Sequence, residues 1–144
     1  MKNIWFVFLC LTAGLDLKNK EIPVWIFYLF EAVGAVAVLA QIGSMKRSEL
    51  LGHAIGISMG LALLWLNRIS NHEIGEGDGW FFLVSGLYLT WQENLSLLCY
   101  GLLLSSIYSL ALVLWGRWKG CSVRKWTIPF LPFVWPVGIW VMSL

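Results

Sequence analysis

The chain has 144 residues, of which 59% are hydrophobic and only 12% are charged, and its mean hydropathy is +0.76. Typical soluble domains have about 25% charged residues, so this composition excludes an ordinary soluble protein. A net charge of +2 is too small for a nucleic-acid-binding protein, and three cysteines without a CxxC pair favour neither a disulfide scaffold nor a zinc module. We therefore expect a protein embedded in a lipid bilayer.

Six apolar runs are bounded by charged or turn residues. In chain order they are Ile4–Leu15, Pro23–Gln41, Leu50–Leu66, Trp80–Trp91, Leu95–Trp115 and Trp126–Met142. We expect all of them to be helices, because they lack the period-two alternation of barrel strands and a helix satisfies its own backbone in lipid. The sequence thus predicts an all-α integral membrane protein, a bundle of six transmembrane helices that forms a single membrane-embedded domain over residues 1–144.

The distribution of Lys and Arg predicts the orientation of this bundle. The connections after the first, third and fifth runs carry Lys18, Lys20, Arg68, Arg117, Lys119, Arg124 and Lys125, whereas the other side carries only Lys2, Lys46 and Arg47. Because basic residues concentrate on the cytoplasmic side, we expect both termini outside and these three connections in the cytoplasm.

The first run has two interpretations. Its short apolar stretch after Lys2 resembles a secretory signal peptide, but no small-x-small cleavage site precedes a polar mature start, so a retained first helix is favoured. This helix ends at Asp16. In the second run, Glu31 is either a packing acid or a group that handles substrate or protons, since acids in membrane segments are rare and often functional.

Small residues recur every four positions in the third and fifth runs. They are Gly52, Gly56 and Gly60, and Gly101, Ser105 and Ser109. Such stripes let helix backbones approach closely, either within one chain or between chains.

The fourth run begins after a glycine-rich turn, Gly75-Glu76-Gly77-Asp78-Gly79. Glycines at these positions permit positive φ and leave room for an extended peptide beside the carboxylate. Asp78 also suits a helix N-cap, and the two roles are compatible.

The predicted topology puts Asp16 and Asp78 on the same membrane face. Two carboxyl groups can hydrolyse a peptide bond when one is ionised and activates water while the other is protonated. Asp78 lies at the positive end of a helix dipole and Asp16 at a negative end, which predicts Asp78 as the base and Asp16 as the acid. The neighbouring Glu73 and Glu76 either attract a basic peptide or are simply solvated. The histidines and cysteines form no nucleophile–base pair.

Three elements occur in a characteristic order: Asp16 with Ile22-Pro23, then Gly75-Glu76-Gly77-Asp78, then Ile128-Pro129-Phe130-Leu131-Pro132-Phe133. This pattern resembles the type IV prepilin peptidases and the related preflagellin peptidases, which are GxGD-type membrane aspartic proteases with six helices. The chain is similar to their small form, which lacks the zinc module and the N-methyltransferase region. Val24, Trp80 and Leu131 depart from residues common in that family, so substrate contacts are expected to differ.

The resemblance implies that Asp16 and Asp78 are the catalytic pair, with no metal and no cofactor. The expected partners are prepilin-like precursors, whose short basic leader precedes an apolar helix, and the bilayer itself; nucleic acid is not expected. The expected location is the cytoplasmic membrane of a bacterium or archaeon, with several crossings and cleavage at the cytoplasmic face. Substrate-binding or supporting residues would be Gly75, Gly77, Glu73, Glu76, Pro23, Pro129 and Pro132.

A different class of function is also compatible with these residues. Six helices that carry Asp16, Glu31 and Asp78 could form a proton-coupled carrier or a non-catalytic subunit of a pilus or secretion assembly.

Overall fold

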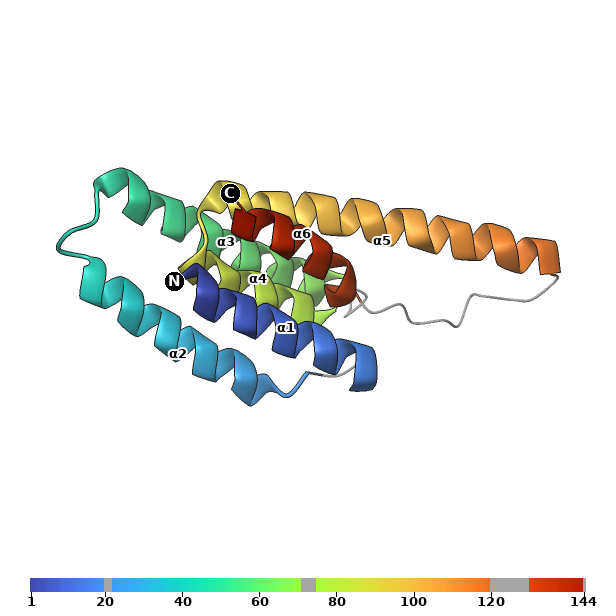
Figure 1. Ribbon diagram of the computed structural model, residues 1–144, viewed down its shortest axis with the longest axis horizontal. Helices are drawn as coiled ribbons and strands as arrows, with labels where there is room; N and C mark the ends of the chain where they lie inside the picture. The colour runs from blue at the N-terminus through green and yellow to red at the C-terminus, as the bar shows by residue number, and fades with distance from the viewer. Residues whose placement is uncertain (20–21, 71–74, 120–129, 144) are drawn as a thin grey trace.

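The computed structural model describes residues 1–19, 22–70, 75–119 and 130–143, and within these ranges the chain forms six helices and no strand. The helices are α1 (Lys2–Asn19), α2 (Val24–Gln41), α3 (Arg47–Ile69), α4 (Glu76–Tyr88), α5 (Trp91–Lys119) and α6 (Leu131–Ser143) (Figure 1). The prediction of an all-α protein is confirmed.

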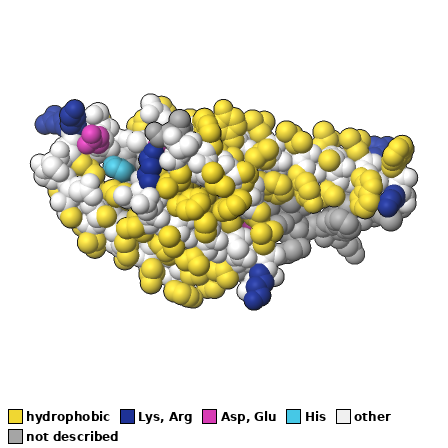
Figure 2. Space-filling model, in the orientation of Figure 1, with side chains coloured by type: hydrophobic (Ala, Val, Ile, Leu, Met, Phe, Trp, Pro, Cys, Tyr) yellow, Lys and Arg dark blue, Asp and Glu magenta, His cyan; other side chains and the backbone are white. Residues whose placement is uncertain are grey.

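Three of the helices, α2, α3 and α5, are long and apolar enough to cross a membrane. Helix α6 is apolar but has only 13 residues, and α1 carries charged residues close to both of its ends. Hydrophobic side chains cover much of the visible surface of the molecule, and the few Lys and Arg side chains lie mostly towards its margins (Figure 2). These features are those of a membrane protein; the number of crossings and the orientation stay predictions.

Helices α1, α3 and α5 extend a few residues beyond both ends of the predicted runs, and the fourth and sixth runs differ in other ways. The fourth run was expected to reach Trp91, but α4 ends at Tyr88 and α5 begins at Trp91. Leu89 is extended, and the Glu93 carboxylate accepts hydrogen bonds from the Thr90 N–H at 2.9 Å and the Thr90 hydroxyl at 3.0 Å. This capping box starts a new helix and so ends the old one. The sixth run was expected from Trp126, whereas α6 starts at Leu131; residues 126–129 lie outside the described part of the chain.

Helix α4 lies at the centre of the bundle. From Gly79 to Tyr88 every residue except the partly buried Trp80 is buried, because α1, α2, α3 and α5 pack around it. At about 1.5 Å per residue its 13 residues span about 20 Å, which is less than the bilayer core of about 30 Å. A helix that is apolar all round is suited to such a buried position.

Helix α3 packs most closely against α4, along the glycine stripe of the third run. A Cβ atom on Gly60 would collide with the backbone of Leu83, and one on Gly86 would collide with the backbone of Gly56. The stripe therefore serves packing within the chain. Asn94 of α5 joins the same contact, since its Nδ2 donates hydrogen bonds to the carbonyl oxygens of Gly56 at 3.2 Å and Phe82 at 3.1 Å.

Helix α1 runs antiparallel to α4 along another of its faces. Trp5 donates a hydrogen bond from Nε1 to the hydroxyl of Ser85 at 2.9 Å, and Phe8 stacks on Phe81 with ring centroids 5.4 Å apart. Residue numbers rise along α1 as they fall along α4. The end of α1 therefore lies near the beginning of α4.

Candidate active site

The two aspartates come together at one end of the bundle. Asp16 lies in the last turn of α1 and Asp78 in the first turn of α4. Asp16 follows Phe8 along α1 and Asp78 precedes Phe81 along α4, so both aspartates lie beyond this stacked pair at the same end of the bundle. Burial raises the pKa of Asp78, and the charge of Asp16 raises it further, which shows that the two carboxyl groups interact.

The carboxylate of Asp16 is bound by the start of α6. Its Oδ2 accepts a hydrogen bond from the backbone N–H of Leu131 at 3.1 Å. First-turn amides of a helix have no intrahelical partner, so this donor is available to a side chain. Leu131 was not among the predicted site residues, although Pro132 has no N–H and leaves the Leu131 amide as the donor next to it.

Burial governs the ionisation of both carboxyl groups. Desolvation, with the added effect of Asp16, raises the pKa of Asp78 from 3.8 to about 7. Burial also raises the pKa of Asp16, but the Leu131 N–H opposes that rise. Burial thus raises the pKa of both groups, and the Leu131 N–H stabilises the charged form of Asp16 alone. These directions favour Asp78 as the group that keeps the proton, which is the reverse of the prediction from helix dipoles.

The glycines around Asp78 adopt ordinary backbone conformations, so the absence of a side chain is the property that distinguishes them. Gly75 is the N-cap of α4 with φ −60°, and Asp78 is the third residue of the helix, so the prediction of Asp78 as N-cap was wrong. A Cβ on Gly75 would lie 2.9 Å from the Asp78 carboxylate, and one on Gly79 would lie 2.7 Å from Leu64. None of Gly75, Gly77 and Gly79 has a left-handed φ. Gly75 and Gly79 therefore leave room for neighbouring atoms, whereas a side chain at Gly77 would meet little.

The other predicted site residues are distributed around this end of the bundle. Glu76 is exposed in the first turn of α4, and Pro23 is the exposed N-cap of α2. A Cβ on Gly77 would meet only Ile22, at 4.0 Å, so the Ile-Pro element adjoins the glycine-rich turn. Pro132 is partly buried in the first turn of α6. Glu73 and Pro129 lie outside the described residues.

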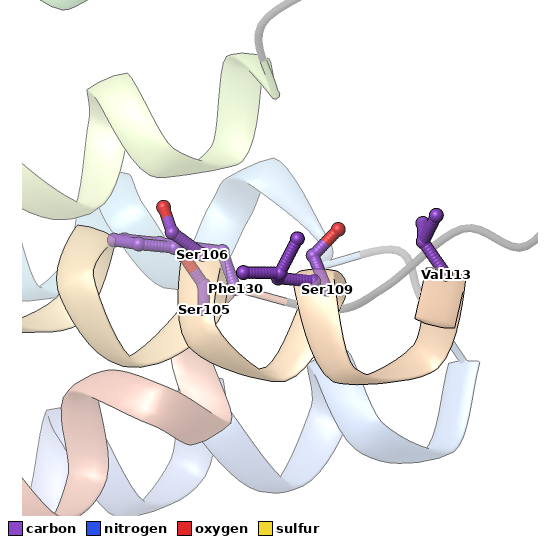
Figure 3. Close-up of a pocket in the computed structure, with 6 residues that line it drawn as sticks. Ser105, Ser106, Ser109, Val113 and Phe130 are labelled. Carbon is purple, nitrogen blue, oxygen red and sulfur yellow. The ribbon is translucent and has the colours of Figure 1, made fainter. Parts of the chain in front are cut away.

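A pocket of about 580 Å³ lies beside the second small-residue stripe. It is lined by Ser105, Ser106, Ser109, Leu110 and Val113 of α5 and by Phe130 (Figure 3). Phe130 immediately precedes Leu131, whose N–H binds Asp16, so the pocket is linked to the aspartate pair through the start of α6. Further towards the N-terminus of α5, Gly101 packs against Phe130 and Val134 within the chain.

Glu31 and His53 lie away from the aspartates. Tyr28 of α2 contacts Trp80, and Tyr88 donates a hydrogen bond to the Phe30 carbonyl at 2.6 Å, so Glu31 lies beside the far half of α4. His53 Nδ1 is 3.2 Å from the Gly86 carbonyl, also near the far end of α4. Neither residue contributes to the site.

These observations define a helical membrane protein with paired carboxyl groups at one end of a central, buried helix. The model of the type IV leader peptidase family matches residues 4–115, and the chain belongs to this family. The match covers both aspartates and confirms the resemblance found in the sequence, so the protein is a peptidase of the leader peptidase type. Comparison with curated proteins and with solved structures found no match.

Proposed function

We propose that this protein is an aspartic endopeptidase that removes the short basic leader of prepilin-like precursors, with Asp16 and Asp78 as the catalytic pair. The observation that carries the proposal is the pairing itself. Two carboxyl groups from distant parts of a leader peptidase interact at one end of the bundle, and the pKa of one of them is raised to about 7. A shared proton between neighbouring carboxyl groups is what acid–base hydrolysis of a peptide bond requires.

In the proposed mechanism Asp16 is the base. Its carboxylate takes a proton from a water molecule while the water oxygen attacks the scissile carbonyl carbon, and Asp78 gives its proton to the carbonyl oxygen. In the second step the protonated Asp16 donates to the leaving nitrogen as the C–N bond breaks, and Asp78 regains a proton from a hydroxyl of the tetrahedral intermediate. One carboxyl ends protonated and the other ionised, so the pair is ready for the next cycle.

The surroundings of the pair suit the two halves of such a substrate. Glu76 is exposed beside Asp78, and its charge would attract a basic leader. We assign the pocket of Ser105, Ser109 and Phe130 to the apolar helix that follows the leader, because it adjoins Leu131 and its small side chains allow a helix to approach closely. The proposed location is the cytoplasmic membrane of a bacterium or archaeon, with cleavage at the cytoplasmic face, as the Lys and Arg distribution predicts.

The test is co-expression of the chain with prepilin-like precursors of its host, followed by intact-mass measurement of the precursor N-termini. Wild type should remove each leader, whereas Asp16→Asn and Asp78→Asn should leave it in place. Glu31→Gln is the matched control, since it removes a partly buried acid away from the pair and should still cut. Intact precursors with well-folded wild type would contradict the proposal and favour an assembly subunit. Loss of transport with Asp78→Asn, while precursor processing is unaffected, would favour a carrier.

A further inference from the structure

Asn67 has an unsatisfied polar group that the fold does not explain. The residue lies near the end of α3, is 3% exposed, and its Oδ1 has no hydrogen-bond partner among the described residues. A buried amide oxygen without a partner is costly, so such groups in native proteins usually meet a ligand, water or substrate. Asn94 also has an unpartnered Oδ1, but its two hydrogen bonds to α3 and α4 explain its burial. Within the described part of the chain, Asn67 makes no such bonds.

The packing of α3 on α4 places Asn67 opposite the turn that carries Asp78. Gly60 lies against Leu83, and Leu64 lies against Gly79 one turn further along α3. The next inward position of α3 is Asn67, and the next turn of α4 is Gly75–Glu76. The Asp78 carboxylate leans back over this same turn, since a Cβ on Gly75 would lie 2.9 Å from its Oδ2.

The first turn of α4 offers the complementary hydrogen-bonding groups. Its N-cap is Gly75, which has no side chain that could accept a hydrogen bond from the amides of this turn. The Asp78 N–H donates to the Gly75 carbonyl at 3.1 Å, which leaves the N–H groups of Glu76 and Gly77 without an intrahelical acceptor at the positive end of the helix dipole. Donors from this turn together with the Oδ1 of Asn67 match a peptide group, which presents one C=O and one N–H.

We propose that Asn67 is a substrate-binding residue that holds the backbone of the leader beside Asp78. Its Oδ1 accepts a hydrogen bond from a substrate N–H, and the first-turn amides of α4 donate to a substrate carbonyl. The inference rests on the proposed leader peptidase function and adds to it a residue outside the three sequence elements of the family resemblance. Such contacts grip the main chain, so they hold leaders of different sequence in the same register.

The first test compares Asn67→Leu with Asn94→Leu in cleavage of a synthetic precursor peptide by purified protein in detergent. We expect Asn67→Leu to lower kcat/KM by about 3- to 10-fold, the value of one neutral hydrogen bond, without lowering the thermal unfolding temperature. Leucine has a similar volume and leaves no unpaired oxygen. Asn94→Leu loses two internal hydrogen bonds and should unfold at a lower temperature.

The second test uses substrates in which one backbone N–H near the cleavage site is replaced by an ester oxygen. One of these esters should be cut several-fold more slowly than the amide by wild type, but no more slowly than the amide by Asn67→Leu, because the same hydrogen bond has already been lost. The inference is overturned if Asn67→Leu cuts as wild type does, if its loss accompanies the lower unfolding temperature seen with Asn94→Leu, or if every ester acts independently of position 67. Failure of wild type to cut any precursor overturns the proposed function itself, and this inference with it.

Discussion

Replacing Asp78 by Asn measures the cost of placing an ionisable carboxyl group at the start of a buried helix. The pKa of Asp78 is about 7 in the folded protein, against 3.8 for an unperturbed aspartate. At a pH between these two pKa values, the folded protein holds a proton that the unfolded chain has released. The free energy of unfolding therefore decreases as the pH rises from about 4 to 7. The difference in pKa corresponds to about 4 kcal/mol, and the ionised form carries that whole cost above pH 7.

Asparagine has the shape of the protonated acid and cannot ionise. We therefore expect Asp78→Asn to leave precursors uncut and yet to be more stable than wild type at pH 8, by up to about 4 kcal/mol, or about 10 °C in unfolding temperature for a chain of this size. The gain should shrink as the pH falls and approach zero below pH 4, where Asp78 becomes neutral in both states.

The assay is thermal unfolding followed by tryptophan fluorescence in detergent, at several pH values between 4.5 and 8.5. Glu76→Gln is the control, because this acid lies in the same turn but is exposed to solvent. Its unfolding temperature should follow that of wild type at every pH. A gain for Asp78→Asn that does not change with pH, or a lower stability than wild type at pH 8, would refute the conclusion that burial raises this pKa.

Three further predictions concern the same site and its support. The cleavage rate should increase with pH as Asp16 ionises and decrease above about pH 7 as Asp78 loses its proton; initial rates in a buffer series check this, and a rate still increasing through pH 8 would contradict it. Gly86→Ala should cost about 2 kcal/mol or more in thermal unfolding, because its Cβ meets the backbone of α3, whereas Gly14→Ala, with open space around it, should be neutral or stabilising. Ser109→Leu should fill the pocket and so raise KM for a full-length precursor, while KM for a control peptide that lacks the apolar helix should not change. Equal KM values of wild type and variant for the full-length precursor would show that the substrate does not use this pocket.

The sequence alone determined the class of protein and indicated the two aspartates on which the proposed mechanism depends. Composition and uninterrupted apolar runs indicate membrane helices because lipid forces each segment to satisfy its own backbone, a local requirement that can be read segment by segment. The aspartates were found in the same way, since a carboxyl group at a membrane boundary is rare. The break between α4 and α5 was missed, although Thr90 and Glu93 form a capping box that depends on only four consecutive residues.

The tertiary structure decided how far each aspartate is buried and which other groups meet it. The dipole argument used only the helix on which each aspartate lies, whereas the pKa of Asp78 depends on what covers it and on Asp16 from another helix. The Leu131 N–H reaches Asp16 from the last helix, and Asn67 faces the site only because the glycines of α3 fix how that helix lies on α4. Desolvation and hydrogen bonding are sums over neighbours that are distant in sequence, so they exist only once the helices have packed.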